Sequence, residues 1–343
     1  MNYYVFVTGC QQNYYDSEKI THLVEKMGYL KSEEYNADLI IAVACSVRQK
    51  AVDRIFGKFK VWNKLKNKPK IIIIGCVLPK DKIKFKSKVL AILDSKNIET
   101  KLPKLINCRT NKLLNNSKII SKQCNNFVPI MYGCNNFCSY CAVPYTRGRE
   151  ISIKQKEIIK EIKYKISCGI DNIVLLGQNV NSYKPGFVKL LKNIETINGL
   201  EKISFMTSHP KDMSRDLINW MANSSKFSSE LHLPVQSGDD EILKKMNRHY
   251  SAESYLKLAL FIKTSVKLNY FSTDIIVGFP GETRDQFKNT YNLCKTINFD
   301  KAFISQYSPR AGTSAAKLKD NVSPEEKKAR WIALDDLINK KKG

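Results

Sequence analysis

The segment YGCNNFCSYC, residues 132–141, places Cys134, Cys138 and Cys141 in one short loop with C-x3-C-x2-C spacing. A structural zinc site normally has four protein ligands and a disulfide uses two cysteines, so three clustered thiols point to another chemistry. Four thiolates saturate a 4Fe–4S cluster, whereas three leave one iron free to bind a substrate or cofactor. The spacing therefore favours an iron–sulfur cluster with one open iron. A zinc site completed by a distant histidine or cysteine is the alternative.

The chain around this loop alternates between apolar strand-like runs and helix-like stretches. Strands are predicted at residues 127–132, 172–178, 202–208, 230–236, 272–279 and 302–308. Helical patterns fill the gaps, notably at residues 154–167, 212–223, 251–266 and 283–297. Six such β/α units predict a partial (β/α)6 barrel with function at the carboxyl ends of its strands. The cysteine loop follows the first strand, on this expected functional side.

The N-terminal segment has a similar but shorter alternation. Three β-branched runs are YYVFVTGC (3–10), ADLIIAVAC (37–45) and PKIIIIGC (69–76), and helix-like stretches lie at 17–27 and 47–66. Continuous apolar runs of this length suit buried parallel strands, so we expect a small open α/β domain with a parallel sheet. Residues 80–126 are polar and weakly patterned, and we interpret them as the end of this domain plus a linker.

Each of the three N-terminal strands ends in a cysteine: Cys10, Cys45 and Cys76. One such cysteine would be read as a small buried hydrophobic residue. Three at the same end of successive parallel strands can meet at one edge of the sheet, where ligands bind in open α/β folds. We therefore expect a second three-cysteine cluster, whose open iron can hold an exogenous sulfur.

The charge composition of the chain indicates what kind of partner it binds. The 343 residues carry 57 basic and 32 acidic side chains, a net charge of +25. Residues 58–88 hold eleven lysines and one acid, Asp81, a pattern that favours phosphate neutralisation and nucleic-acid binding. A biased genome composition is the alternative, because lysine far outnumbers arginine.

The redox compartment follows from the cysteines and the absence of export signals. The longest apolar runs, such as IIIIGCVL (71–78), are too short to cross a bilayer, and the N-terminus has no secretory pattern. We therefore expect a cytoplasmic protein with no membrane contact, in which clustered thiols bind metal or do chemistry.

The loop at the mouth of a partial barrel resembles the radical S-adenosylmethionine (SAM) superfamily, and two cysteine trios in one chain resemble the methylthiotransferases. Several short sequence motifs of the chain are similar to those of the MiaB family, the tRNA-2-methylthio-N6-dimethylallyladenosine synthases. The matching segments run along nearly the whole chain: GCQQNYYDSE (9–18), GCNNFCSYCAVPYTRGRE (133–150), LLGQNVNSY (175–183), TSHPKDMS (207–214), LHLPVQSGDDEILKKMNR (231–248), STDIIVGFPGET (272–283) and YSPRAGTSAA (307–316).

This resemblance implies a reaction, its cofactors and its partners. The cofactors are SAM and two 4Fe–4S clusters. The cluster on Cys134, Cys138 and Cys141 cleaves SAM, and the cluster on Cys10, Cys45 and Cys76 carries the sulfur that a second SAM methylates. The radical abstracts hydrogen from carbon 2 of N6-isopentenyl-adenosine 37 in tRNA, and a methylthio group replaces it. An electron donor such as flavodoxin or ferredoxin and a sulfur donor are further partners of an enzyme expected to be a monomer.

Contacts to SAM are predicted from strand ends. Gln178, Asn179, Ser208 and Gln236 end the second, third and fourth barrel strands, and Arg248 suits the planar SAM carboxylate. For each, hydrogen bonding to loop backbone is the alternative.

Several other residues carry weaker expectations. Asp274, inside an apolar strand, needs a buried partner or a polar barrel interior. His209 is expected to make a loop hydrogen bond rather than to bind metal, and the turn at 278–282 can approach adenine. Arg147 and Arg149 are expected to contact tRNA phosphate or the cluster surroundings, or to be a solvated pair. Two further cysteines, Cys168 and Cys294, are expected to pack in the core.

The predicted organisation has three parts. Residues 1–124 form the methylthiotransferase N-terminal domain with its auxiliary cluster and linker, residues 125–322 the radical SAM domain, and residues 323–343 a C-terminal helix. Family members normally continue into a TRAM domain, which we expect to be absent here. The chain also differs from the family after Cys76, where the segment GCVLPKDK (75–82) does not match the family's usual sequence.

Two alternative functions stay open at this point. One is methylthiotransfer to another acceptor, ribosomal protein S12 or a threonylcarbamoyl-adenosine tRNA. The other is a truncated chain that binds tRNA without activity.

Overall fold

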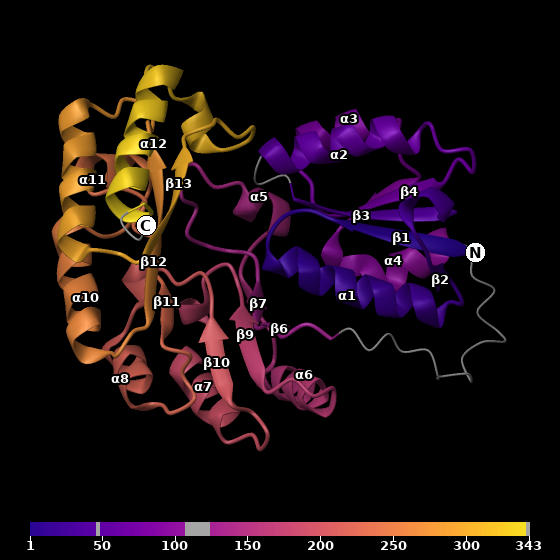
Figure 1. The fold of residues 1–343 in the computed structure, drawn as a ribbon, viewed down its shortest axis with the longest axis horizontal. Coiled ribbons are helices and arrows are strands. Elements are labelled where there is room, and N and C mark those ends of the chain that lie inside the picture. Colours follow the sequence, from indigo (N-terminus) through magenta and orange to yellow (C-terminus); the bar gives the residue numbers. More distant parts are fainter. Residues whose placement is uncertain (46–48, 107–123, 341–343) are drawn as a thin grey trace. The chain divides into compact units, whose positions relative to one another are not determined.

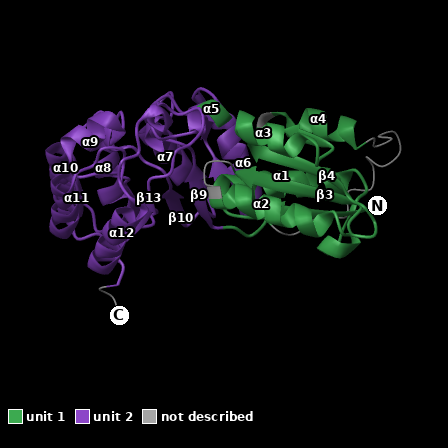
Figure 2. Cartoon of the chain, turned by 90° about the horizontal axis from the view of Figure 1, so that it is seen from above, with its two compact units in different colours: residues 1–127, 145–147, 167–170 green, residues 128–144, 148–166, 171–343 purple. Residues whose placement is uncertain are grey.

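The computed structural model describes residues 1–45, 49–106 and 124–340. The predicted helix start at 47, most of the predicted linker and the last three residues lie outside this range. The described chain forms two compact units (Figure 2). Unit 1 comprises residues 1–127, 145–147 and 167–170, and unit 2 comprises residues 128–144, 148–166 and 171–343.

Unit 1 is built on a parallel sheet of five strands in the order β2-β1-β3-β4-β5. The strands are β1 (Asn2–Val7), β2 (Leu30–Lys31), β3 (Leu39–Cys45), β4 (Lys70–Cys76) and β5 (Ala91–Leu93). The helices are α1 (Gln11–Lys26), α2 (Gln49–Trp62), α3 (Pro79–Lys86) and α4 (Ile98–Leu105). The predicted open parallel α/β unit is therefore confirmed.

The alternation of side chains along the strands buries both faces of this sheet. Ile41 and Ile72 pack with α1 and α4, while Ile40 and Ile73 pack with α2 and α3. This explains the uninterrupted β-branched runs, since every residue of a central parallel strand needs an apolar neighbour. Figure 1 shows the two helix layers on opposite sides of the sheet.

One expectation for unit 1 was wrong in detail. Helix α1 begins at Gln11, six residues before the predicted start, because its first turn is polar and lacks apolar periodicity. The described residues 79–106, most of which we interpreted as the end of the domain, contain α3, β5 and α4. These elements are short, and α4 carries Pro103 in its interior, so their sequence signal is weak.

Unit 2 contains the predicted partial barrel. Its strands lie in two three-stranded sheets, β10-β9-β6 and β11-β12-β13, with a small antiparallel pair β7-β8. Their bounds are β6 (Phe127–Pro129), β7 (Met131–Tyr132), β8 (Ile151–Ser152), β9 (Asn172–Leu176), β10 (Lys202–Phe205), β11 (Glu230–His232), β12 (Tyr270–Val277) and β13 (Lys301–Gln306). Each of the six predicted barrel strands overlaps at least one of these elements.

Helices separate these strands along the chain. They are α5 (Val143–Arg147), α6 (Gln155–Ser167), α7 (Phe187–Glu195), α8 (Arg215–Asn223), α9 (Asp240–Lys245), α10 (Ala252–Ser265), α11 (Arg284–Ile297) and α12 (Pro324–Ile338). One apolar core joins most of them to the strands. Ser323 caps α12 by accepting from Glu326 N. None of the described helices has the length and hydropathy needed to span a membrane.

Candidate functional site

The three-cysteine loop of unit 2 follows the short strand β7. Cys134 N–H donates to Gly148 O (3.2 Å), and Cys141 N–H donates to Cys138 O (2.9 Å). Phe137, between the first two cysteines, has a positive φ of 48°, an uncommon backbone conformation for a residue with a side chain. The loop therefore turns tightly, so that its thiols face a common region.

A distant segment, residues 245–248 after α9, holds this loop in place. Asn247 Nδ2 donates to the carbonyl oxygens of Asn136 (3.1 Å) and Phe137 (3.0 Å). Ser139 Oγ donates to Lys245 O (2.7 Å). Because these partners lie more than 100 residues apart, sequence reasoning could not assign this supporting role to Asn247.

Two N–H groups point at the sulfurs of the loop. Asn136 N lies 3.5 Å from Cys134 Sγ, and Arg248 Nη1 lies 3.4 Å from Cys138 Sγ. Such donors stabilise negative charge on sulfur. Arg248 is buried, and its other groups donate to Pro234 O (3.1 Å) and Tyr250 Oη (2.9 Å).

Burial raises the pKa of the Cys141 thiol to about 12, and neighbouring Cys138 and Cys134 act in the same direction. Burial likewise raises the pKa of Cys134. Without a metal these thiols are therefore protonated near neutrality. Metal binding must displace their protons and is coupled to pH.

The second trio gathers at the carboxyl edge of the unit 1 sheet. Cys45 and Cys76 end β3 and β4 and are register partners, and Cys10 is the N-cap of α1, three residues after the end of β1. Gly9 has a φ of 133°, and a Cβ there would lie 2.6 Å from Cys45 Cβ. A glycine is therefore required for the Cys10 loop to pass this close to Cys45.

Arg147 is the charged neighbour of this trio. It is buried and belongs to unit 1. Its Nη2 lies 3.4 Å from Asn13 Oδ1, the same atom that lies 3.6 Å from Cys10 Sγ. Burial alone disfavours the charged guanidinium, but Cys76, Cys10 and Asp16 raise the pKa of Arg147 above its ordinary value. Of the alternatives that the sequence left open, the surroundings of the cysteines fit, and a solvated pair does not.

The arrangement differs from a mononuclear metal site. Over residues 1–45, 49–106 and 124–340, no group of three histidine, cysteine or carboxylate side chains is placed to hold a metal ion. An iron–sulfur cluster requires a wider spacing of its cysteines than a single metal ion does, because each thiolate binds a separate iron.

The predicted SAM contacts lie at strand ends of unit 2. Asn179 and Ser208 follow β9 and β10, and two links hold these ends together: Val180 N to Thr207 O (3.2 Å) and His209 N to Asn181 Oδ1 (2.9 Å). Gln178 is partly exposed beside them.

Gln236 follows β11, and neighbouring residues link its segment to these strand ends. Tyr250 Oη donates to Val235 O (2.8 Å), and the Tyr250 ring packs against His209. The structure therefore brings Asn179, Ser208, Gln236 and Arg248 to one edge.

Orphaned polar atoms mark this edge. In the part of the chain that the structure describes, Asn179 Oδ1, Ser208 Oγ and His209 Nε2 are buried without a hydrogen-bond partner. Thr207 and Gln236 also hold positive φ angles of 67° and 71°. Unsatisfied buried groups and backbone strain both cluster at ligand sites, so this edge fits a polar ligand.

His209 makes the loop hydrogen bond expected from the sequence, since its Nδ1 accepts from Lys211 N (3.3 Å). Burial, assisted by the Arg248 and Lys211 charges, lowers the pKa of His209 to about 2. The imidazole is therefore neutral at physiological pH, and because Nδ1 accepts a hydrogen bond, Nε2 carries the proton and can donate to a ligand.

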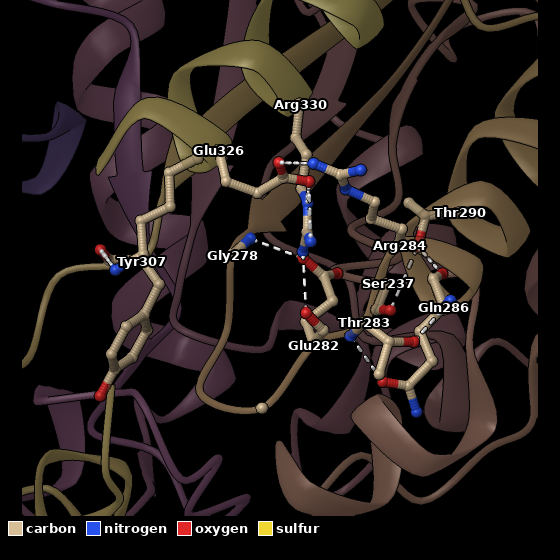
Figure 3. Close-up of polar contacts among 12 residues, drawn as sticks. Ser237, Gly278, Glu282, Thr283, Arg284, Gln286, Thr290, Tyr307, Glu326 and Arg330 are labelled. Carbon is tan, nitrogen blue, oxygen red and sulfur yellow. Dashed lines mark hydrogen bonds and ion pairs between the residues drawn. The ribbon is translucent and has the colours of Figure 1, made fainter. Parts of the chain in front are cut away.

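The glycine turn after β12 is held by a buried ion pair, shown in Figure 3. Glu282 Oε2 accepts from Gly278 N (2.6 Å) and from Arg330 Nη1 of α12 (2.6 Å). Arg330 also pairs with Glu326 on its own helix (3.1 Å). The contacts of Glu282 fix the shape of the turn and connect it to the last helix.

The two cysteines predicted to pack in the core, Cys168 and Cys294, differ in burial. Cys294 is buried in the core of unit 2, as expected, whereas Cys168 is exposed, so its predicted packing role was wrong. Cys168 follows the end of α6, where the helical periodicity no longer indicates which face is buried.

Two sequence profiles match the chain. Residues 128–294 match the profile described as "Radical SAM superfamily", and residues 2–93 match the profile described as "Uncharacterized protein family UPF0004".

Curated relatives extend this similarity over almost the whole chain. The chain is 42% identical over 365 residues to "tRNA-2-methylthio-N(6)-dimethylallyladenosine synthase" of Clostridium botulinum (strain Okra / Type B1), covering 98% of this chain and 81% of that protein. A protein of the same description from Carboxydothermus hydrogenoformans is 41% identical over 369 residues, covering 98% and 83%.

Solved structures share the fold at low sequence identity. The radical S-adenosylmethionine methyltransferase TsrM from Kitasatospora setae, solved with cobalamin and a 4Fe–4S cluster, has a TM-score of 0.68 at 11% identity, over 92% of this chain and 77% of that one. The cobalamin-dependent radical enzyme OxsB has a TM-score of 0.58 at 12% identity, over 99% and 56%. At these identities the likeness shows the fold alone.

Proposed function

Because the chain belongs to the family of tRNA-2-methylthio-N(6)-dimethylallyladenosine synthases, we propose that it transfers a methylthio group to carbon 2 of N6-isopentenyl-adenosine 37 in tRNA. The reaction uses radical SAM chemistry with two 4Fe–4S clusters. The observation that carries the proposal is the presence of two separate cysteine trios, one in the loop after β7 and one at the carboxyl ends of parallel strands, each beside a buried arginine.

The trios fit iron–sulfur clusters in their donor chemistry. Cys134, Cys138 and Cys141 would hold one cluster, and Cys10, Cys45 and Cys76 the other. When bound, the first supplies reductive cleavage of SAM to a 5′-deoxyadenosyl radical, and the second supplies the sulfur. Arg248 and Arg147 each hold positive charge against the thiolates of one trio.

The orphaned atoms at the strand ends fit SAM, which carries an amino group, hydroxyls and a carboxylate. Asn179 and Ser208 would orient SAM through their unpaired oxygens, and Gln178 and Gln236 would complete the contacts at this edge. The pairing of Arg248 with the SAM carboxylate stays a prediction, because the hydrogen bonds of its guanidinium go to Cys138, Pro234 and Tyr250.

The residues of the chain contribute position and exclusion of water. Asn247 holds the cysteine loop by two backbone carbonyls, so that its thiols keep their geometry when SAM binds. Burial of Cys134 and Cys138 keeps water away from the site of radical formation. Neutral His209 adds no positive charge to the strand edge that would hold SAM.

The proposal extends to organisation, partners and location. Residues 1–124 would carry the sulfur-bearing site and residues 125–322 the SAM-cleaving site, with residues 323–343 as a C-terminal helix. An electron donor such as flavodoxin or ferredoxin, a sulfur donor, a monomeric state and a cytoplasmic location are parts of the same proposal. Buried reduced thiols are compatible with a reducing compartment.

The test is an anaerobic assay of the reconstituted protein. Iron, sulfide, SAM, a reductant and tRNA bearing N6-isopentenyl-adenosine 37 are combined, and the digested tRNA is analysed by mass spectrometry. Parallel reactions contain tRNA with threonylcarbamoyl-adenosine, or ribosomal protein S12, as the acceptor.

We expect the methylthiolated nucleoside from the isopentenylated tRNA and from neither other acceptor. Product on another acceptor would reassign the substrate. Release of 5′-deoxyadenosine without any methylthiolated product would contradict the proposed transfer while leaving SAM cleavage in place.

A further inference from the structure

Among the described residues, helices α10, α11 and α12 pack on one face of the β11-β12-β13 sheet. Phe271, Thr273 and Ile275 of β12 are buried on the helix side, where the core includes residues of α10, α11 and α12. Figure 1 shows these three helices gathered on one side of β12 and β13. Because side chains alternate along a strand, Ser272 and Asp274 face the opposite side.

Three polar side chains on this second face form a chain of contacts. His232 Nδ1 lies 3.0 Å from Ser272 Oγ, and His232 Nε2 lies 3.4 Å from Asp274 Oδ2. With the proton assigned to Nε2, Ser272 donates to the ring and the ring donates to Asp274. His232 therefore orients the carboxylate, whose second oxygen, Oδ1, can accept a hydrogen bond from a ligand.

An exposed aromatic ring stands next to this carboxylate. Phe303 of β13 is the register partner of Asp274, and its ring centroid lies 5.8 Å from that of His232. Phe303 is 49% exposed, although it lies in the middle of a strand. An acceptor beside an exposed ring suits a flat molecule that carries an N–H group at its edge.

The position of this group ties it to the candidate SAM site. Gln236 N donates to Asp274 O (2.8 Å), and Ile276 N donates to Gln236 O (3.0 Å). A ligand on Asp274 and Phe303 would therefore lie next to a predicted SAM contact.

Two other uses of these side chains fit less well. A serine–histidine–carboxylate chain can activate a nucleophile, but Ser272 is only 3% exposed and the hydroxyl cannot reach a substrate. A metal site needs more ligands, and the described residues supply no third histidine, cysteine or carboxylate at a metal-binding distance.

We propose that Asp274 and Phe303, with His232 as a positioning residue, form the recognition site for the N6-substituted adenine of the substrate. Asp274 accepts the single N6 hydrogen, and Phe303 packs against the base and its isopentenyl group. This inference rests on the proposed function and adds to it the residues that select the base.

The test measures binding of three anticodon stem-loop RNAs to the reconstituted, SAM-bound protein. They carry N6-isopentenyl-adenosine, adenosine or purine riboside at position 37, and purine riboside has no exocyclic amine. The variants are Phe303→Ala, Asp274→Ala and His232→Gln. Leu260→Ala on α10 is the matched control, because Leu260 is similarly exposed (40%) but lies on a helix.

Phe303→Ala should reduce the preference for isopentenyl-adenosine over adenosine by about tenfold, the scale of burying part of the apolar isopentenyl group. Asp274→Ala should remove the preference for adenosine over purine riboside, and His232→Gln should reduce it. Leu260→Ala should keep both ratios. Phe303→Leu, which keeps an apolar side chain, should keep part of the first preference, and this would exclude misfolding as the cause.

The result that overturns the inference is a wild-type protein that methylthiolates isopentenylated RNA while the three variants retain both ratios. A wild-type protein that modifies no RNA would count against the proposed function instead, so the two failures are distinguishable.

Discussion

The two cysteine trios are assembled in opposite ways. Cys134, Cys138 and Cys141 come from one loop, whereas Cys10, Cys45 and Cys76 come from three strand ends distributed over 67 residues. The loop trio can be recognised from spacing alone. The strand-end trio exists only when the parallel sheet forms, because strand pairing is what makes Cys45 and Cys76 neighbours.

The trios nevertheless share their local design. Each depends on a glycine with positive φ, Gly133 in the loop and Gly9 before Cys10. Each has a buried arginine, Arg248 directly against Cys138 and Arg147 near Cys10 through Asn13. The comparison teaches that backbone freedom and a compensating charge are required at both sites, however the thiols are brought together.

The largest expected effect comes from the two glycines. Gly9→Ala would place a Cβ against Cys45, and Gly133→Ala would overlap the carbonyl oxygens of Gly148 and Arg149. Each variant should lose the cluster of its own trio, so bound iron should fall by about half if the clusters are alike. Iron analysis and electron paramagnetic resonance after reconstitution measure this.

Gly57→Ala in α2 is the control, since a Cβ there meets no atom within 4 Å. A Gly9 variant that loses the loop cluster, or a Gly133 variant that loses the strand-end cluster, would refute the assignment of one cluster to each trio.

Substitutions in the lysine-rich helix α3 of unit 1 test whether this region binds tRNA. Lys80, Lys82, Lys84 and Lys86 are exposed, with Asp81 as the one acid of the helix. Replacing all four by glutamine should weaken tRNA binding and lower the slope of log K against log salt by about 1–3. Filter binding over a range of salt concentrations measures both.

The matched control removes the same charge from α6 and its N-terminal flank in unit 2. Lys154, Lys156, Lys160 and Lys163 are exposed but alternate with Glu157 and Glu161. An equal loss of salt dependence in both quadruple variants would show that total charge, rather than α3, governs binding.

The two arginines should act on different clusters. Adding an electron makes a cluster more negative, so a nearby positive charge stabilises the reduced form. Arg248→Gln should therefore lower the reduction potential of the loop cluster, and Arg147→Gln that of the strand-end cluster, each by about 50–100 mV. Redox titration followed by electron paramagnetic resonance measures the shifts. Arg→Lys variants keep the charge and should retain most of the potential, and a shift at the other cluster would contradict the pairing.

Much of the fold and of the thiol chemistry could be predicted from residue patterns. Apolar runs and turn spacing located the central strands, and Cys10, Cys45 and Cys76 lie at one edge because parallel strands share a direction. The elements β5 and α4 were missed, since short polar segments take their structure from packing rather than from periodicity.

Side-chain partners across long sequence separations could not be predicted. Nothing in the local sequence shows that Asn247 supports the cysteine loop or that His232 is the partner that Asp274 requires. Arg147 follows the loop trio in sequence but lies near the other trio, so its motif was compatible with several roles.

The smallest expected effect concerns His209, which makes the stability of unit 2 depend on pH between pH 7 and pH 5. Burial holds the pKa of His209 far below 6.5, so the unfolded chain takes up a proton at acid pH that the folded chain does not. Stability is therefore present above pH 6.5 and is lost as pH falls toward the folded pKa. Between pH 7 and pH 5 the loss is about 2 kcal/mol.

His209→Asn should remove this dependence, because the substituted amide does not titrate and its oxygen can still cap the same turn. Thermal melts of both proteins at pH 7 and pH 5 measure the difference. Parallel losses in the two proteins would contradict a neutral buried His209.

The central claim is that the loop trio serves SAM cleavage and the strand-end trio serves sulfur transfer. The most direct test compares Cys45→Ala with Cys138→Ala in the anaerobic assay. Exposed Cys168→Ala serves as the control. We predict that Cys45→Ala releases 5′-deoxyadenosine but makes no methylthiolated nucleoside, and that Cys138→Ala makes neither. Methylthiolated nucleoside from Cys45→Ala, or 5′-deoxyadenosine from Cys138→Ala, would contradict this division of labour.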